Sequence, residues 1–411
     1  MEETFEPGFL SRDFYVLTST QATGEGIDPS ETVVPVITLS PQEMLSIPKS
    51  LFAVAIVLLF CLPALAQSTP QPLTSKEIVA LVYQLPKYPG KRDEIVEEIR
   101  RRGIGFPLTD GMRSLVATKS GNDPLLRRTL EEAERRRLNP TASALPSEAE
   151  GTELLERTRR ATLAAADAMP DFIVKQVIKR TAAFGGTNNW IPQDNLTIAV
   201  SYRATAGEEY KVLTVNGIPP AREAKETKEY GEYVGGSTST GEYVTGLAAI
   251  FKPKSSTQFK LVDTDLLRGR RTLVYEFIVE KPFSDLTLKA GRDLIASAGS
   301  RGRIWIDREN NRVLRFEQIA TEVPLDFPIT AASSLIDYDW VDINDQQFLL
   351  PSRAEILITS VHRKETVQTR NEIRFRGYRK FGAELKVIDE IDDSDFPPDK
   401  QEPEKPTSKN P

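Results

Sequence analysis

Two kinds of hydrophobic periodicity divide this chain. From Leu73 to Leu138, apolar residues recur every three to four positions, the spacing that places them on one side of an α-helix. After Pro170 the apolar residues alternate with polar ones, and this pattern predicts a series of strands that ends with a short strand near Leu385. The sequence therefore predicts a helical part followed by a sheet.

Four short helices are predicted in a helical module over residues 73–138. Thr74 or Ser75 caps the first helix, Thr109 caps the third, and Asp123 precedes the proline that opens the fourth. Residues of these types accept hydrogen bonds from the free backbone N–H groups of a first helical turn. The module is predicted to form a small apolar core of its own.

A linker and a longer helix are predicted to join this module to the sheet. Residues 139–151 are rich in Pro, Ser and Ala, which is typical of a linker, and an amphipathic helix is predicted from Thr152 to about Met169. A further helix, over residues 241–251, interrupts the strands. Because the connections are short, we expect an α+β fold whose sheet, within residues 152–388, is antiparallel.

The strand pattern also selects residues for one face of the sheet. Eight large apolar side chains alternate on three predicted strands: Ile198, Val200, Tyr202, Tyr275, Phe277, Val279, Ile304 and Ile306. The helix over residues 241–251 follows the glycine-rich stretch 231–241 and adds four lid candidates: Tyr243, Leu247, Ile250 and Phe251. In a hollow sheet the eight residues line an apolar cavity, and in a solid sheet they form the core.

A predicted hairpin within this region carries a resemblance. Residues 302–307 (GRIWID) precede a turn at 308–311 and an apolar return strand, and the stretch 338–351 through 372–378 continues the sheet. Together with the long helix and the inserted helix, this order resembles the periplasmic lipoprotein-carrier family, the outer-membrane lipoprotein-sorting proteins, in a secreted bacterial form. The resemblance implies a curved, half-open barrel covered by helices. It further implies that acyl chains are held by apolar surface, without a catalytic centre or a cofactor.

Residues 44–66 are typical of an export signal. Lys49 precedes an apolar run from Leu51 to Leu62, and a small-x-small triplet ends at Ala66, in front of Gln67. The run is short for the ~30 Å hydrocarbon core, so we expect cleavage after Ala66 and a location in the periplasm or cell envelope, with an uncut anchor as the alternative. Residues 1–43 are then a mis-called extension or a disordered tail.

The composition of the chain argues against two kinds of binding site. The net charge of −6 argues against nucleic-acid binding, which needs a basic face. Cys61, the only cysteine, lies inside the predicted signal, so the mature chain has no disulfide and no thiolate metal ligand. Residues 389–411 are acidic and rich in proline, and a disordered tail is expected there.

Titratable residues give little support for catalysis or metal binding. His362, the only histidine, is expected at the surface, and Asp263 and Asp265 on a solvated strand face. Four further carboxylates lie close together in sequence: Asp337, Asp339, Asp342 and Asp345. The period of a strand predicts that they point outward and that Tyr338 and Trp340 point inward. A calcium site is the alternative for these carboxylates. No catalytic residue, metal or cofactor is predicted.

The sequence leaves three functions open. The first is a non-enzymatic envelope protein that binds or carries a lipid, an acylated protein or another apolar ligand in a cavity of the sheet. The second is an envelope interaction or sensor protein with a solid sheet and a partner-docking helical module; a hydrolase is the third. The arginine runs 100–102 and 135–137 complement helix ends, with peripheral contact to an anionic membrane as the alternative.

Overall fold

The structure is a computed structural model, and it divides the chain into two compact units. One unit spans residues 22–138, and the other combines residues 1–21 with 139–411. The residues that the structure describes are 15–19, 70–187, 189–220, 231, 234–291, 293–362, 365–380, 391–392 and 396. The predicted signal, with Ala66 and Gln67, lies outside them.

The first unit is built from four α-helices and a short 3-10 turn within its described part. They are α2 (Ser75–Val82), η2 (Pro89–Lys91), α3 (Arg92–Arg102), α4 (Asp110–Lys119) and α5 (Pro124–Leu138). Thr74 caps α2 in a capping box with Glu77, and Thr109 caps α4 through the N–H of Met112. The apolar stripes of these helices form a separate core that includes Ile78, Ile99 and Leu126.

The two arginine runs end α3 and α5 and are held by ion pairs inside this unit. Arg102 pairs with Glu77 at 2.8 Å and with Glu98 at 3.2 Å. The other pairs are Arg100–Glu97, Arg101–Glu98, Arg135–Glu132 and Arg137–Glu134. These contacts give the runs a structural role at the helix ends.

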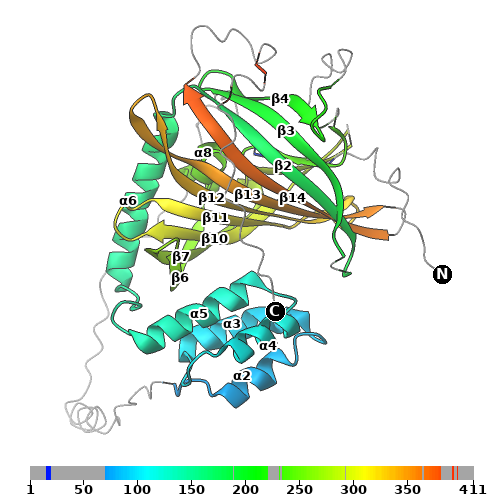
Figure 1. The fold of residues 1–411 in the computed structure, drawn as a ribbon. Coiled ribbons are helices and arrows are strands. Elements are labelled where there is room, and N and C mark those ends of the chain that lie inside the picture. Colours follow the sequence, from blue (N-terminus) through cyan, green and yellow to red (C-terminus); the bar gives the residue numbers. More distant parts are fainter. Residues whose placement is uncertain are drawn as a thin grey trace, which may run out of the picture. The chain divides into compact units, whose positions relative to one another are not determined.

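A ten-stranded antiparallel sheet dominates the second unit (Figure 1). Its strands, in spatial order, are β4 (Gly207–Val215), β3 (Ile191–Arg203), β2 (Phe172–Phe184), β14 (Glu365–Lys380), β13 (Gln346–His362), β12 (Ile329–Ile343), β11 (Val313–Thr321), β10 (Gly299–Asp307), β7 (Arg270–Val279) and β6 (Gln258–Leu267). Figure 1 shows that the sheet is strongly curved, and its end strands β4 and β6 do not pair with each other in the described residues. The predicted α+β fold with a half-open sheet is confirmed.

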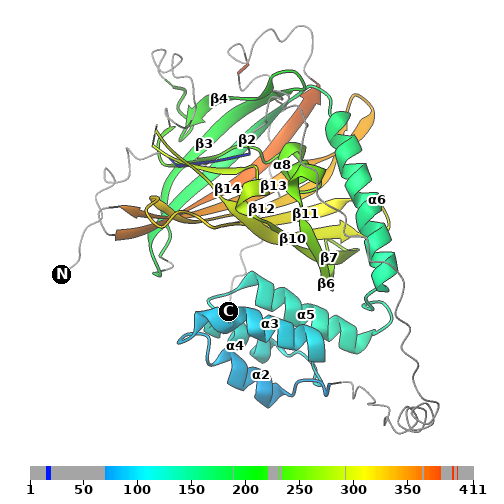
Figure 2. The ribbon, with the colours of Figure 1, turned by 180° about the vertical axis from the view of Figure 1, so that it is seen from behind.

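Smaller elements cover one face of this sheet (Figure 2). They are the helices α6 (Glu148–Asp167) and α8 (Val244–Ala249), the 3-10 turns η4 (Pro253–Ser255) and η5 (Lys281–Phe283), and a four-stranded sheet of β5 (Ser237–Ser239), β1 (Tyr15–Ser19), β8 (Leu286–Ala290) and β9 (Leu294–Ser297). α6 begins at Glu148, within the predicted linker, because Ser147 and Glu150 form a capping box. β1 lies in the predicted N-terminal extension and pairs with β5 and β8.

The two faces of the large sheet bury different residues. The face covered by α6 and α8 is called the inner face. Its core includes all twelve residues that were predicted to line a cavity or to form a lid. The outer face carries two smaller clusters. One contains Leu267, Val274, Trp305 and Leu314, and the other contains Ile173, Ala199, Leu213, Ile391 and Phe396. The last two residues belong to the predicted tail, so part of that segment packs on the sheet.

Two strand faces differ from the prediction. Asp263 and Asp265 were expected to be solvated, and this is wrong, since each is 5% exposed. Asp265 accepts a hydrogen bond of 3.0 Å from the indole N–H of Trp305. The pairing of β6 with β7 shifts register between Leu261 and Asp263, and such an irregularity changes which side chains reach a given face.

A second bulge alters the acidic strand. The pairing of β12 with β13 shifts between Asp337 and Tyr338, so both of these residues are buried, while Trp340 is 40% exposed instead of inward. Asp337 forms a bidentate ion pair with Arg315 at 2.7 and 2.8 Å. Asp339, Asp342 and Asp345 are exposed, and the part of the chain that the structure describes holds no cluster of metal ligands.

Two observations concern other predictions. His362 is the last residue of β13, and its side chain lies outside the described parts of the structure. Within the described ranges, every helix is too short or too polar to cross a bilayer.

Candidate ligand-binding site

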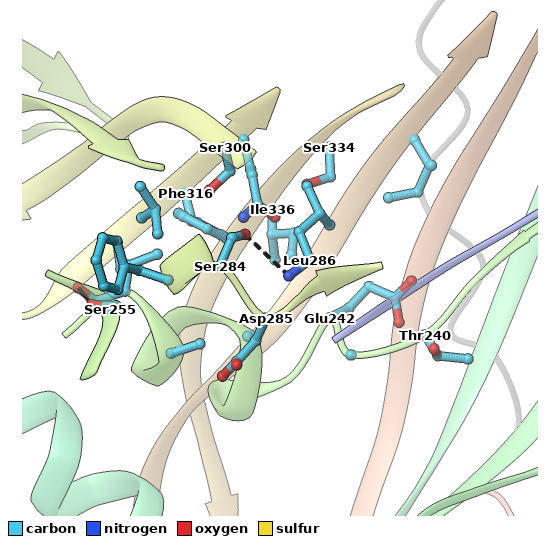
Figure 3. A pocket seen from close by; sticks show the side chains of 18 residues that line it. Thr240, Glu242, Ser255, Ser284, Asp285, Leu286, Ser300, Phe316, Ser334 and Ile336 are labelled. Carbon is cyan, nitrogen blue, oxygen red and sulfur yellow. Dashed lines mark hydrogen bonds between the residues drawn. The ribbon is translucent and has the colours of Figure 1, made fainter. Parts of the chain in front are cut away.

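A small cavity lies between α8 and the inner face (Figure 3). Its volume is about 40 Å³, enough for a few water molecules and far below the ~300 Å³ at which ligand pockets begin. The walls come from the segment around α8, from residues 283–286 and from the inner face of β7 and β10 to β13. They are mostly apolar, with Val279, Phe316 and Ile336 from the sheet and Ile250 from the segment that follows α8.

The structure brings the predicted cavity residues together as a filled core. Val279 and Ile250 line the cavity, while most of the other ten pack against one another, at 0–6% exposure. Phe251 stacks on Phe259 with ring centroids 5.4 Å apart, and Phe277 stacks on Phe316 at 5.6 Å. The two cavities beside these residues, of about 40 and 80 Å³, are too small for an acyl chain.

α8 separates this cavity from a second one. The second cavity, of about 80 Å³, is lined by Thr162 and Ala165 of α6, by Met169 after this helix, by Leu247 of α8, and by Tyr338 and Leu349 of the sheet. A helix of six residues with small cavities on both sides makes fewer close contacts than a core strand does.

The segment before α8 is held firmly, although its glycine-rich sequence suggested a flexible hinge. Arg180 of β2 is 6% exposed and pairs with Asp194 at 2.5 Å. It also donates hydrogen bonds to the carbonyl oxygens of Val234 and Gly235. Ser237 and Asn371 add a further link between β5 and β14. Any movement of α8 therefore has to begin after β5.

Glu208 of β4 holds the start of α8. Its carboxylate accepts hydrogen bonds from the N–H of Gly241 at 3.0 Å, from the hydroxyl of Tyr210 at 2.5 Å and from Thr245 at 3.5 Å. Burial raises the pKa of Glu208, and these three hydrogen bonds only partly oppose the shift. The first turn of α8 is thus tied to an edge strand of the sheet through one buried carboxyl group.

Glu242, the residue after Gly241, lines the cavity (Figure 3). It is 2% exposed, and one carboxylate oxygen accepts a hydrogen bond from the hydroxyl of Ser239. The other oxygen, Oε2, is buried and has no hydrogen-bond partner among the described residues. Burial raises the pKa of Glu242 to about 7, and the nearby charge of Glu208 adds to the shift.

Three tyrosines interact electrostatically with these carboxyl groups. Tyr243 and Tyr338 are buried and Tyr378 is partly buried; desolvation raises the pKa of each, and Glu242 contributes to each shift. Gln176 of β2 donates to the hydroxyl of Tyr243 at 3.3 Å. The side-chain oxygens of Gln176 and Tyr338 have no partner among the residues described. Glu242 lines the first cavity and Tyr338 the second.

Sequence reasoning missed both carboxyl groups of this site. Glu242 stands in an otherwise apolar segment, between Gly241 and Tyr243, and a lone charged residue there was the available signal. Glu208 follows a turn and gave no such signal. The arrangement suits binding, since Glu242 presents a hydrogen-bond acceptor to a mostly apolar cavity.

Comparisons with known proteins are limited to distant similarity of structure. No family model and no curated protein matches the sequence. A domain named as an outer membrane lipoprotein-sorting protein, from Vibrio parahaemolyticus, is 11% identical; the match covers 57% of this chain and 94% of that one, with a TM-score of 0.25. A DUF1329 family protein from Desulfovibrio piger is 10% identical, with 58% and 98% covered and a TM-score of 0.24.

A third similar structure is the MucA/MucB complex of Pseudomonas aeruginosa. It is 9% identical, with 56% of this chain and 100% of that one covered, and its TM-score is 0.17. The lipoprotein-sorting fold that the sequence resembles is thus found among the similar structures. All three TM-scores are far below 0.5.

Proposed function

We propose that this protein is an exported, non-enzymatic envelope protein that binds an apolar ligand on the inner face of its sheet. The ligand is a lipid, or the acyl chain of an acylated protein. The observation that carries the proposal is that a separate short helix, α8, covers the open side of the sheet above an apolar cavity.

Ligand entry requires that α8 moves away from the sheet. The present cavity of about 40 Å³ holds no chain, but α8 is one and a half turns long and lies between two cavities. Displacing it uncovers the apolar side chains of β7, β11 and β12 that now line the cavity. Affinity then comes from apolar burial, at roughly 25 cal/mol per Å².

A glycine in α8 provides the test. A Cβ atom on Gly246 would lie 2.6 Å from the carbonyl oxygen of Gly241, so Gly246→Ala forces the start of α8 to shift. If closure of α8 opposes binding, this variant binds an apolar fluorescent probe, such as a pyrene-labelled fatty acid, up to about tenfold more tightly than the wild type. The control is Gly111→Ala in α4, where a Cβ meets only the side chain of Thr109 at 3.9 Å.

Native mass spectrometry provides a second test. The protein, purified from a lipid-containing extract, is expected to carry an apolar molecule. If neither the wild type nor Gly246→Ala binds the probe or carries such a molecule, the proposal is rejected.

Export is tested by the N-terminus of the mature protein. Cleavage after Ala66 predicts Gln67 as the first residue found by N-terminal sequencing of envelope material. Cleavage would also remove β1, and β8 would keep β9 as its neighbour in the small sheet. A mature chain that still contains residues 15–19 would contradict this part of the proposal.

The tight packing of the inner face favours a second candidate, an envelope interaction or sensor protein. In that case the helical unit docks a partner protein. Tyr83 and Tyr88 are 55% and 48% exposed there, and exposed tyrosines are typical of interfaces. In cross-linking from envelope extract, the double variant Tyr83→Ser/Tyr88→Ser is expected to lose a partner that the wild type and the exposed-site variant Leu325→Ser both retain.

A further inference from the structure

We infer that the cavity under α8 binds the protonated amine of an amphiphilic ligand, with the Glu242 carboxylate as its counter-ion. This inference rests on the proposed function and adds the chemical class of the headgroup. An aliphatic amine with an apolar tail is the simplest ligand of this class.

An unpaired acceptor carries the inference. Glu242 lines the cavity and is 2% exposed, and its Oε2 atom is buried without a hydrogen-bond partner among the described residues. An ionised carboxylate only accepts hydrogen bonds. A ligand group that brings donors and a positive charge satisfies it best.

Two further unpaired oxygens, Gln176 Oε1 and Tyr338 Oη, are not among those that line this cavity. Tyr338 lines the second cavity, and Gln176 donates to the hydroxyl of Tyr243, the residue that follows Glu242. The inference therefore depends on Glu242. An ammonium group has three donors and one positive charge, so it supplies both the hydrogen bond and the counter-charge that Glu242 lacks.

No cation of the protein fills this role in the described structure. Glu242 has no Lys or Arg partner there, and its hydrogen bonds come from the hydroxyl of Ser239 and from its own backbone N–H. Arg180, a buried cation of the neighbouring segment, is already paired with Asp194. A carboxylate headgroup would be repelled by Glu242 and Glu208, and an alcohol would bring a single donor.

The size and lining of the cavity fit a headgroup with an apolar body. About 40 Å³ holds a group of the size of an ammonium ion but no alkyl chain. Val279, Phe316, Ile336 and Leu286 line the same cavity, so a chain attached to the headgroup meets apolar surface as soon as α8 moves. Figure 3 shows Glu242 near Thr240, and Asp285 apart from both.

The pH dependence of binding follows from the groups around Glu242. Burial raises the pKa of Glu242 to about 7, so its carboxyl group ionises between pH 6 and 8. Glu208 from β4 also has a raised pKa, Tyr243, Tyr338 and Tyr378 stay neutral, and Asp285 is paired with Lys254. An alkylamine, with a pKa of about 10, stays protonated. Amine affinity therefore rises with pH over this range.

The test compares octylamine, octanol and octanoate by isothermal titration calorimetry on the full-length protein. At pH 8 the wild type is expected to bind octylamine at least about tenfold more tightly than octanol, and octanoate more weakly than both. At pH 6 the ratio of amine to alcohol falls several-fold. Glu242→Gln, which keeps the shape of the side chain, loses both the preference and its pH dependence.

Glu153→Gln is the matched control. It makes the same change from carboxylate to amide at an exposed position of α6 that does not line the cavity, so this variant is expected to keep the preference for the amine. If Glu242→Gln does not fold, the pH profile of the wild type alone still decides, since a ratio that is constant from pH 6 to 8 overturns the inference.

The possible failures are distinguishable. Equal affinity for octylamine and octanol, or a preference that survives in Glu242→Gln, overturns the inference and leaves the proposed function intact. If none of the three compounds binds, even to Gly246→Ala, both the inference and the proposed function are rejected.

Discussion

The inner and outer faces of the large sheet differ in the pairing of some of their buried polar groups, although Arg180 and Asn371 on the inner face are paired. On the outer face, Asp265 bonds to the indole of Trp305, and Asp337 forms a bidentate pair with Arg315. On the inner face, the oxygens of Glu242, Gln176 and Tyr338 remain without partners among the described residues. Both sets lie in strongly buried surroundings, so burial alone does not explain the difference.

The difference indicates what each face is for. A buried polar group that is paired contributes to the stability and register of a sheet, whereas an unpaired one costs about 1–3 kcal/mol. The outer face therefore bears the marks of a structural surface. The inner face keeps a destabilising group under a short helix, which is the pattern expected of a binding site.

The largest loss of stability is expected from a change in β10, a strand that contributes to both faces of the sheet. Gly302 lies in the middle of β10, and a Cβ atom there would be 1.8 Å from the backbone oxygen of Glu317 and 2.8 Å from the ring of Phe277. Gly302→Ala is expected to lower the free energy of unfolding by about 4 kcal/mol, measured by urea denaturation. The control Gly111→Ala changes it by less than 1 kcal/mol, and an equal effect of the two variants would contradict this reasoning.

Breaking an outer-face pair has the next largest effect. Arg315→Ala leaves the carboxylate of Asp337, which is 8% exposed, with only Arg268 nearby at 3.5 Å. We expect a loss of about 3 kcal/mol in urea denaturation, because a buried charge is left without its main partner. Arg157→Ala, which breaks an exposed pair with Glu153 in α6, should cost less than about 0.5 kcal/mol.

Removing the charge of Glu242 is expected to raise the free energy of unfolding, and the gain is expected to depend on pH. The pKa of Glu242 is raised to about 7 in the folded protein from an ordinary value of 4.5, so the wild type loses stability as pH rises from about 4.5 through 7. Between pH 5 and 8 it is expected to lose roughly 2 to 3 kcal/mol more than Glu242→Gln. If the free energies of unfolding of the two proteins depend on pH in the same way, Glu242 is not the cause of the loss, since Glu208 is present in both.

The smallest effect concerns the C-terminal segment on the outer face. Phe396 is 5% exposed, packs near Ile173 and lies within 5.8 Å of Lys175 and 5.6 Å of Arg379. Phe396→Ala is expected to lower the free energy of unfolding by about 1–2 kcal/mol, because apolar burial and cation–π contacts are lost. Leu325→Ala, at a fully exposed position, serves as the control, and no difference between the two would indicate that the segment is not anchored.

Much of the architecture was predictable because periodicity is local. The helical period over residues 73–138 and the alternation after Pro170 predicted the classes of element, and the confirmed fold is an α+β protein with an open antiparallel sheet. Capping residues such as Thr109 marked helix starts for the same reason: they act on the backbone three residues away. The faces of Asp263 and Asp337 were mispredicted, because a β-bulge depends on the neighbouring strand.

The amino-acid sequence alone specifies which side chains are apolar and how they alternate, and this alternation makes one face of the sheet apolar. Only the tertiary structure decided that this face is filled, since packing density depends on which elements return to cover it. It also decided that oxygens of Glu242, Gln176 and Tyr338 are buried without partners among the described residues. Whether a polar oxygen finds a partner is a property of three-dimensional neighbours, and no pattern along the chain contains it.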